Sequence, residues 1–102
     1  MVYKGRNREC RGRLNSFFDL PENVQLIFKN IKREINAELI ENIDVYVYGS
    51  YLHGYWDAES DFDVSIKTII NEVPLKKKIS ESLGIKVDIF CTKDTNAMIL
   101  IP

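Results

Sequence analysis

The sequence has little of what would set it apart from an ordinary globular domain. No apolar run approaches the roughly 18 residues of a membrane span, and no apolar stretch follows the N-terminal arginines, so we expect neither membrane insertion nor export and place the protein in the cytoplasm. Glycine and proline supply only 5 and 3 of the 102 residues, which excludes collagen-like and low-complexity chains. The two cysteines, Cys10 and Cys91, lack metal-ligand spacing, and we expect free thiols rather than a disulfide.

The composition and the charge distribution indicate one folded domain with a basic N-terminal arm. Hydrophobic residues make up 45% of the chain and charged residues 28%, as in soluble globular proteins. Residues 1–13 carry five basic residues and one acidic residue, a net charge of +4, which leaves −5 for the rest of the chain. We expect residues 1–18 to form a flexible basic arm, which is either a solubilising terminus or a contact for nucleic acid or an acidic partner. Residues 19–102 are expected to form the single domain.

A long amphipathic helix is predicted over residues 21–40. Asp19 is a candidate N-cap, and Glu22 follows it three residues later, as in a capping box. Apolar residues then recur every three or four positions, which places them on the helical face that packs on the core. These residues are Val24, Phe28, Ile31, Ile35 and Leu39.

Three strands and a second helix are predicted after this helix. β-branched and aromatic residues indicate strands at 43–48, 61–70 and 85–91. The second helix is expected to begin near Pro74 and to end at Gly84. The order helix, strand, loop, strand, helix, strand predicts an α/β (α+β) fold in which helices pack on a small mixed β-sheet.

Carboxylates in the second and third predicted strands are candidate metal ligands. Side chains two apart on a strand point to the same face with Cα atoms about 6.5 to 7 Å apart, so Asp61 and Asp63 can reach the same cations while Phe62 points into the core. Asp88 is flanked by apolar residues, and burying its charge is costly unless it is paired, hydrogen-bonded or metal-bound. A strand-edge charge paired with Lys86 is the simpler interpretation of Asp88.

The turn after the first predicted strand is a candidate phosphate site. Gly49 permits a sharp turn and close approach of the backbone, and Ser50 offers a hydroxyl and an amide at the start of a helical turn through Tyr51 and Leu52. Three carboxylates with two Mg²⁺ ions would leave a mildly positive site, which suits an anionic nucleoside triphosphate.

Three short segments occur in one order along residues 20–91. They are Val47-Tyr48-Gly49-Ser50 followed by Gly54, then Ser60-Asp61-Phe62-Asp63-Val64, then Val87-Asp88-Ile89. Their combination resembles the DNA polymerase β-type nucleotidyltransferase superfamily, and within it the minimal nucleotidyltransferase domains of prokaryotes. The resemblance implies the nucleotidyltransferase fold.

The resemblance also implies a role for each residue that matches a motif. Gly49 and Ser50 would hold the triphosphate, Asp61 and Asp63 would bind both metal ions, and Asp88 would complete the site and help to activate the acceptor hydroxyl. The implied reaction transfers a nucleoside monophosphate, AMP from ATP or the equivalent from another nucleoside triphosphate, to a hydroxyl group. Two Mg²⁺ ions, or Mn²⁺ in their place, would serve as cofactors, and the implied acceptor is a partner protein such as a HEPN-type toxin, which this chain would counter as an antitoxin.

Two other functions stay open at this point. The chain could be a catalytically silent module of the same fold that binds a protein through its aromatic loop and apolar tail, or a small-molecule nucleotidyltransferase of the aminoglycoside-modifying type, which normally needs a further domain. Nucleic acid is not an expected substrate, because only the basic arm offers a track for it. No membrane partner is expected, and the sequence leaves the oligomeric state open.

Several other residues allow two interpretations each. Tyr51 and His53 stand where members of the family often carry arginine. Tyr51, Tyr55 and Trp56 could stack on a base or pack the loop on the core. The lysines at 76–78 are interpreted as a solvated helix face, with contact to the acceptor or to nucleic acid as the alternative. Residues 98–102 are interpreted as either a packed tail or an exposed association surface.

Overall fold

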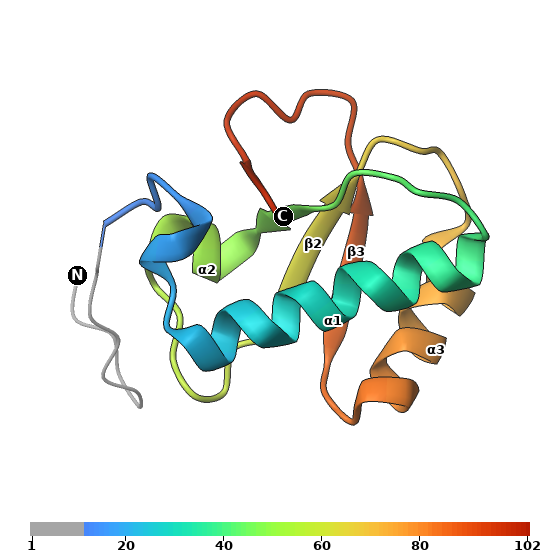
Figure 1. Cartoon of the computed structure of the whole chain (residues 1–102), viewed down its shortest axis with the longest axis horizontal. Helices are drawn as coiled ribbons and strands as arrows, with labels where there is room; N and C mark the ends of the chain where they lie inside the picture. The colour runs from blue at the N-terminus through green and yellow to red at the C-terminus, as the bar shows by residue number, and fades with distance from the viewer. Residues whose placement is uncertain (1–11) are drawn as a thin grey trace.

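The fold combines a four-stranded sheet with three α-helices (Figure 1). It is seen in a computed structural model that describes residues 12–102. The elements are a 3-10 helix η1 (Phe17–Asp19), α1 (Glu22–Leu39), β1 (Tyr46–Tyr48), α2 (Gly49–His53), β2 (Phe62–Ile66), α3 (Glu72–Leu83), β3 (Val87–Cys91) and β4 (Ile99–Leu100). None of the helices in this range combines the length and apolarity that crossing a bilayer requires.

The sheet is mixed, as the sequence predicted. Its strand order is β3-β2-β1-β4, with β1 antiparallel to both β2 and β4 and with β2 parallel to β3. Val64 lies opposite Val47 on one side and opposite Ile89 on the other, and all three side chains are buried. The neighbouring positions point to the opposite face, so Asp63 lies between Tyr48 and Asp88 on that face.

One face of the sheet is covered by α1, which runs across it beside α3 (Figure 1). The predicted apolar stripe of α1 provides the contact, since Phe28, Ile31 and Ile35 are completely buried. Because α1 and α3 occupy the face of the buried valines, the aspartates lie on the face that these two helices leave uncovered.

The first residues of α1 and α3 differ from those that the sequence predicted. Pro21 is the N-cap of α1 and makes no side-chain cap, because its ring has no acceptor atom, while Asp19 closes the turn before it. There Asp19 Oδ2 accepts a hydrogen bond from Ser16 N at 3.0 Å, and Ser16 Oγ accepts one from Phe18 N at 3.2 Å, so the capping box belongs to η1. α3 begins two residues before Pro74, with Asn71 as its N-cap, and ends at Gly84 as predicted.

Each strand is shorter than predicted, and a fourth strand was not predicted. A strand ends where the neighbouring strand no longer offers it hydrogen-bond partners. The apolar residues beyond that point therefore belong to loops, although their composition is typical of strands. β4 has only two residues, too few for a period-two pattern, and Ile99 pairs with Val47. Ile101 is completely buried, so residues 98–102 are a packed tail, with Leu100 partly exposed at the sheet edge.

The described part of the basic arm contacts the domain. Leu14 N donates a hydrogen bond to Leu52 O at 3.0 Å, and Phe17 is buried in the core. Residues 1–11, which carry most of the basic charge and Cys10, lie outside the described residues. Cys91 is a free thiol.

Candidate active site

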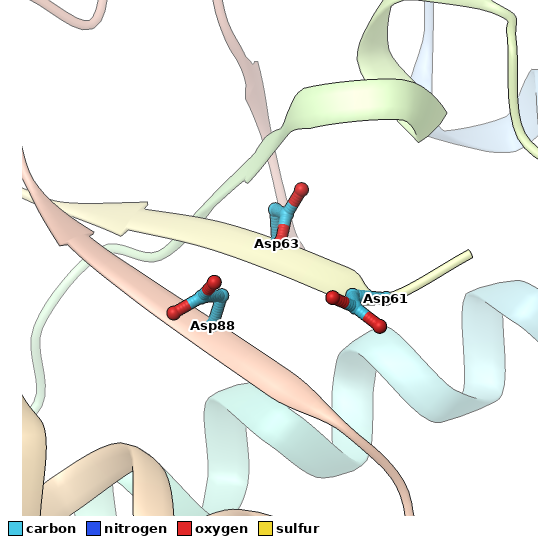
Figure 2. Close-up of side chains that lie close together, drawn as sticks. All are labelled: Asp61, Asp63 and Asp88. Atoms are coloured by element: carbon cyan, nitrogen blue, oxygen red, sulfur yellow. The ribbon is translucent and has the colours of Figure 1, made fainter.

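Three carboxylates from two neighbouring strands meet on the open face of the sheet (Figure 2). The parallel register of β2 and β3 sets Asp63 opposite Asp88, and the period of two brings Asp61, just before β2, to the same face. One oxygen from each of the three lies within 4.8 Å of the other two. The structure therefore brings together the three aspartates that the sequence singled out, and we call them the acidic triad.

The charged form of Asp63, the middle residue of the acidic triad, is destabilised by its surroundings. Burial, and after it the negative charges of Asp88 and Asp61, raise the pKa of Asp63 from the ordinary 3.8 to about 6, while Lys86 acts in the opposite direction. Within residues 12–102, Asp63 forms no ion pair. Divalent cations would relieve this repulsion, and carboxylate oxygens are the ligands that Mg²⁺ and Mn²⁺ prefer, so the three residues fit such ions.

The two outer carboxylates are paired with lysines. Lys76 Nζ lies 3.2 Å from Asp88 Oδ1, and Lys86 Nζ lies 3.5 Å from Asp61 Oδ2. The pairing of Lys86 with Asp88, which the sequence left open, is therefore wrong. The register explains this, because Phe62 pairs with Val87 and the residues one position earlier, Asp61 and Lys86, also lie side by side.

Lys76 is the contact that sequence reasoning missed. We interpreted the lysines at 76–78 as a solvated helix face, which holds for Lys77 and for Lys78, whose Nζ pairs with Glu38 at 3.0 Å. Lys76 instead turns towards Asp88 across the gap between α3 and β3. No local pattern distinguishes it from its neighbours, because the contact depends on how α3 crosses the edge strand.

The glycine turn after β1 lies against the acidic triad. Gly49 has a φ of +67°, and a Cβ on it would overlap the Asp63 carboxylate and lie 2.9 Å from Asp63 Cβ and Cγ. In Figure 2 the ribbon that leads into α2 passes directly beside Asp63. Ser50, half-buried, is the second residue of α2. Gly49 is therefore required both for its backbone conformation and for the close approach.

Tyr51 and Trp56 pack on the core, whereas Tyr55 is exposed. Tyr51 is 4% exposed, and its ring stacks on Phe62 with centroids 5.0 Å apart and on Trp56 with centroids 5.2 Å apart. Phe28 of α1 meets the rings of both Tyr51 and Phe62 edge-on. Of the two interpretations left open for Tyr51, packing is the one that the structure supports. His53 is exposed at the last position of α2.

The raised pKa of Asp63 predicts that the metal-free protein loses stability as the pH rises. Between its unfolded pKa of 3.8 and its folded pKa of about 6, the folded state binds more protons than the unfolded state. The contribution of Asp63 to the free energy of unfolding is therefore largest below about pH 4 and declines through about pH 6, by about 1 kcal/mol once solvent screening of this half-exposed group is allowed for.

Urea denaturation in EDTA across this pH range measures the effect. The Asp63→Asn variant serves as the reference, because it lacks only this titration. If the difference in unfolding free energy between the two proteins does not change with pH, the raised pKa is wrong.

The chain matches known proteins over the segment that contains this site. The model of the family described as "Nucleotidyltransferase domain" matches residues 29–95, which include the acidic triad, Gly49 and Ser50. A protein of Methanocaldococcus jannaschii, named as a candidate protein adenylyltransferase, is 37% identical over 70 residues, which cover 62% of this chain and 69% of that protein. No solved structure matches the chain significantly.

Proposed function

Because this chain belongs to the nucleotidyltransferase domain family and is thus a transferase, we propose that it transfers AMP from ATP to a hydroxyl group of a partner protein in the presence of Mg²⁺. The observation that carries the proposal is the acidic triad, whose oxygens lie within 4.8 Å of one another next to the glycine turn at Gly49. A protein acceptor and ATP as the donor are consistent with the name of the relative from Methanocaldococcus jannaschii.

Each residue of the site would have a separate task. Asp61 and Asp63 would hold the metal ions, with Asp88 completing their ligands, and Gly49 and Ser50 would position the triphosphate through the backbone and the hydroxyl. Bound Mg²⁺ would supply charge neutralisation at the triphosphate and activation of the attacking oxygen. Asp88 would accept the acceptor's hydroxyl proton and pass it to water.

The reaction balances as an in-line displacement. The acceptor oxygen forms a bond to the α-phosphorus of ATP, the bond from that phosphorus to the oxygen bridging to the β-phosphate breaks, and pyrophosphate leaves on the opposite side. Gly49 and Ser50 lie at the end of β1 and Asp88 lies in β3, with Asp63 of β2 between them. This arrangement suits a leaving group on the α2 side and an acceptor on the Asp88 side.

We further propose that the acceptor is a small toxin of the HEPN type and that AMP transfer to its hydroxyl makes this chain its antitoxin. The support is the resemblance to prokaryotic minimal domains together with the protein acceptor in the name of the relative.

Transfer of label tests the proposal. The chain is incubated with Mg²⁺, ATP labelled at the α-phosphate and a purified HEPN-type toxin, and we expect label on the toxin, which EDTA prevents. Calorimetry measures binding of Mg²⁺ and ATP separately. A chain that binds neither would be a silent module of the same fold, and the proposed function would be wrong.

A further inference from the structure

A pocket of about 400 Å³ lies next to the acidic triad, between α3 and β3. Three lysines line it, Lys76 and Lys77 from α3 and Lys86 from the position just before β3, and it shares Asp88 with the triad. We call it the lysine pocket. Among its lining residues only Val87 and Asp88 belong to the motifs that carry the family resemblance, and the proposed function has so far given the lysines no role.

The base of the lysine pocket is fixed in place. Ser80 Oγ of α3 accepts a hydrogen bond from Val87 N at 3.0 Å and donates one to Val87 O at 3.3 Å. These two bonds tie the helix to the edge strand where the strand has no neighbour on that side. The lysines therefore project from a rigid base, which lowers the entropic cost of binding.

The lysine pocket lies on the side of the acidic triad away from the glycine turn. The strand order β3-β2-β1 places Asp63 between Asp88 and the end of β1, where Gly49 begins α2. If the triphosphate binds at Gly49, as the proposed function has it, the incoming hydroxyl of an in-line displacement approaches from the Asp88 side. That is the side on which the lysine pocket opens.

Binding of metal ions would change the charge of the lysine pocket. Lys76 and Lys86 are paired with Asp88 and Asp61, the carboxylates that would hold the ions. Divalent cations on these carboxylates would compete with both ammonium groups and release them, since like charges repel at such short range. Within residues 12–102, Lys77 makes no ion pair. The loaded site would therefore present three unpaired ammonium groups at the acceptor side.

From the charge and the position of the lysine pocket, we propose that it binds an acidic segment of the acceptor polypeptide. This proposal rests on the proposed function. The segment would place its hydroxyl beside Asp88, and its binding would strengthen when Mg²⁺ and nucleotide occupy the triad. A short acidic segment fits better than a nucleic acid, because outside residues 1–13 the chain carries a net charge of −5, which repels a long polyanion.

Fluorescence anisotropy tests the proposal directly. The probe is a fluorescein-labelled peptide with one tyrosine flanked by glutamates, and the matched peptide has glutamine in their place. Both are measured with the full chain, Mg²⁺ and an ATP analogue whose bond between the α- and β-phosphates cannot be cleaved. We expect the glutamate peptide to bind about tenfold more tightly than the glutamine peptide, and EDTA to remove most of this preference.

Two variants test whether the preference for the glutamate peptide depends on the lysine pocket. The double variant Lys76→Gln with Lys77→Gln is expected to bind the glutamate peptide about tenfold more weakly, the sum of two exposed charge contacts. Lys78→Gln is the matched control, because Lys78 lies on the same helix, pairs with Glu38 and does not line the pocket. It should bind the peptide as the parent does. Circular dichroism establishes that both variants fold.

The outcomes separate this inference from the proposed function. If the parent chain fails to bind Mg²⁺ with the ATP analogue in calorimetry, the proposed function is wrong. If it binds the analogue but does not distinguish the two peptides, or if the double variant matches Lys78→Gln, only the lysine pocket is wrongly assigned. Tighter binding of a labelled single-stranded oligonucleotide than of the peptide, lost in the double variant, would also overturn it.

Discussion

Replacing Asp63 with asparagine will abolish AMP transfer and at the same time stabilise the metal-free fold. The carboxylate lies between Asp61 and Asp88 in the acidic triad, and without its charge the two remaining groups cannot hold a pair of divalent ions. Metal ions contribute several kcal/mol to transition-state stabilisation in such reactions, so we expect the rate to fall by about a thousandfold or more.

The gain in stability has the same cause as the loss of activity. Burial and the neighbouring carboxylates raise the pKa of Asp63 to about 6, so near pH 7 the folded protein holds its negative charge at a cost. Asparagine has almost the same shape and no charge, and we expect an increase of about 1 kcal/mol in unfolding free energy in EDTA.

Label transfer and thermal unfolding in EDTA measure the two effects. Asp44→Asn is the control, because Asp44 is exposed in the loop before β1 and takes no part in the acidic triad. It should change neither quantity. An Asp63→Asn protein that transfers label at the parental rate, or that unfolds more easily than the parent, contradicts the account of the site.

Replacing Gly49 with alanine is expected to have the second-largest effect, and it should damage both stability and activity. The φ of +67° is unfavourable for any residue with a Cβ, which costs about 1 kcal/mol. In addition, the new methyl group would overlap the Asp63 carboxylate and lie 2.9 Å from Asp63 Cβ. Either the turn or the carboxylate must move, and a displacement of about 1 Å costs an active site about a hundredfold in rate.

Gly84→Ala isolates the backbone contribution. Gly84 has the same φ of +67°, but a Cβ on it would have no atom within 4 Å. We therefore expect Gly84→Ala to lose about 1 kcal/mol of stability and to transfer label normally, whereas Gly49→Ala loses transfer as well. Equal transfer rates in the two variants would show that the close approach of Gly49 to Asp63 has no function.

The sequence predicted the local parts of the site better than the contacts between them. Asp61 and Asp63 share a face because of the period of two along a strand, and any strand through these residues has this property. That Asp88 lies beside Asp63 depends on the parallel register of β2 and β3, which comes from the crossover through α3. The apolar flanks of Asp88 and the family resemblance both pointed to this contact, but no local pattern predicted the register that produces it.

The contacts of Lys76 and Lys86 could not be predicted from the sequence, for a related reason. Lys86 is two residues from Asp88, which suggested a pair between them, yet the register places it next to Asp61. Lys76 reaches Asp88 across an interface between a helix and a strand. Charge pairs of this kind depend on distances between elements, and composition and periodicity carry no information about those distances.

The edge-on contacts of Phe28 have a consequence for how damage to this protein would show itself. One ring of α1 touches both Tyr51, in the segment that follows the glycine turn, and Phe62, between two of the triad carboxylates. The position of the glycine turn relative to the acidic triad is thus set partly by a side chain that belongs to neither. A smaller side chain at Phe28 would loosen the turn and the carboxylates from each other as well as destabilise the core, so a loss of transfer in such a variant would have its origin in α1 and not in the acidic groups themselves.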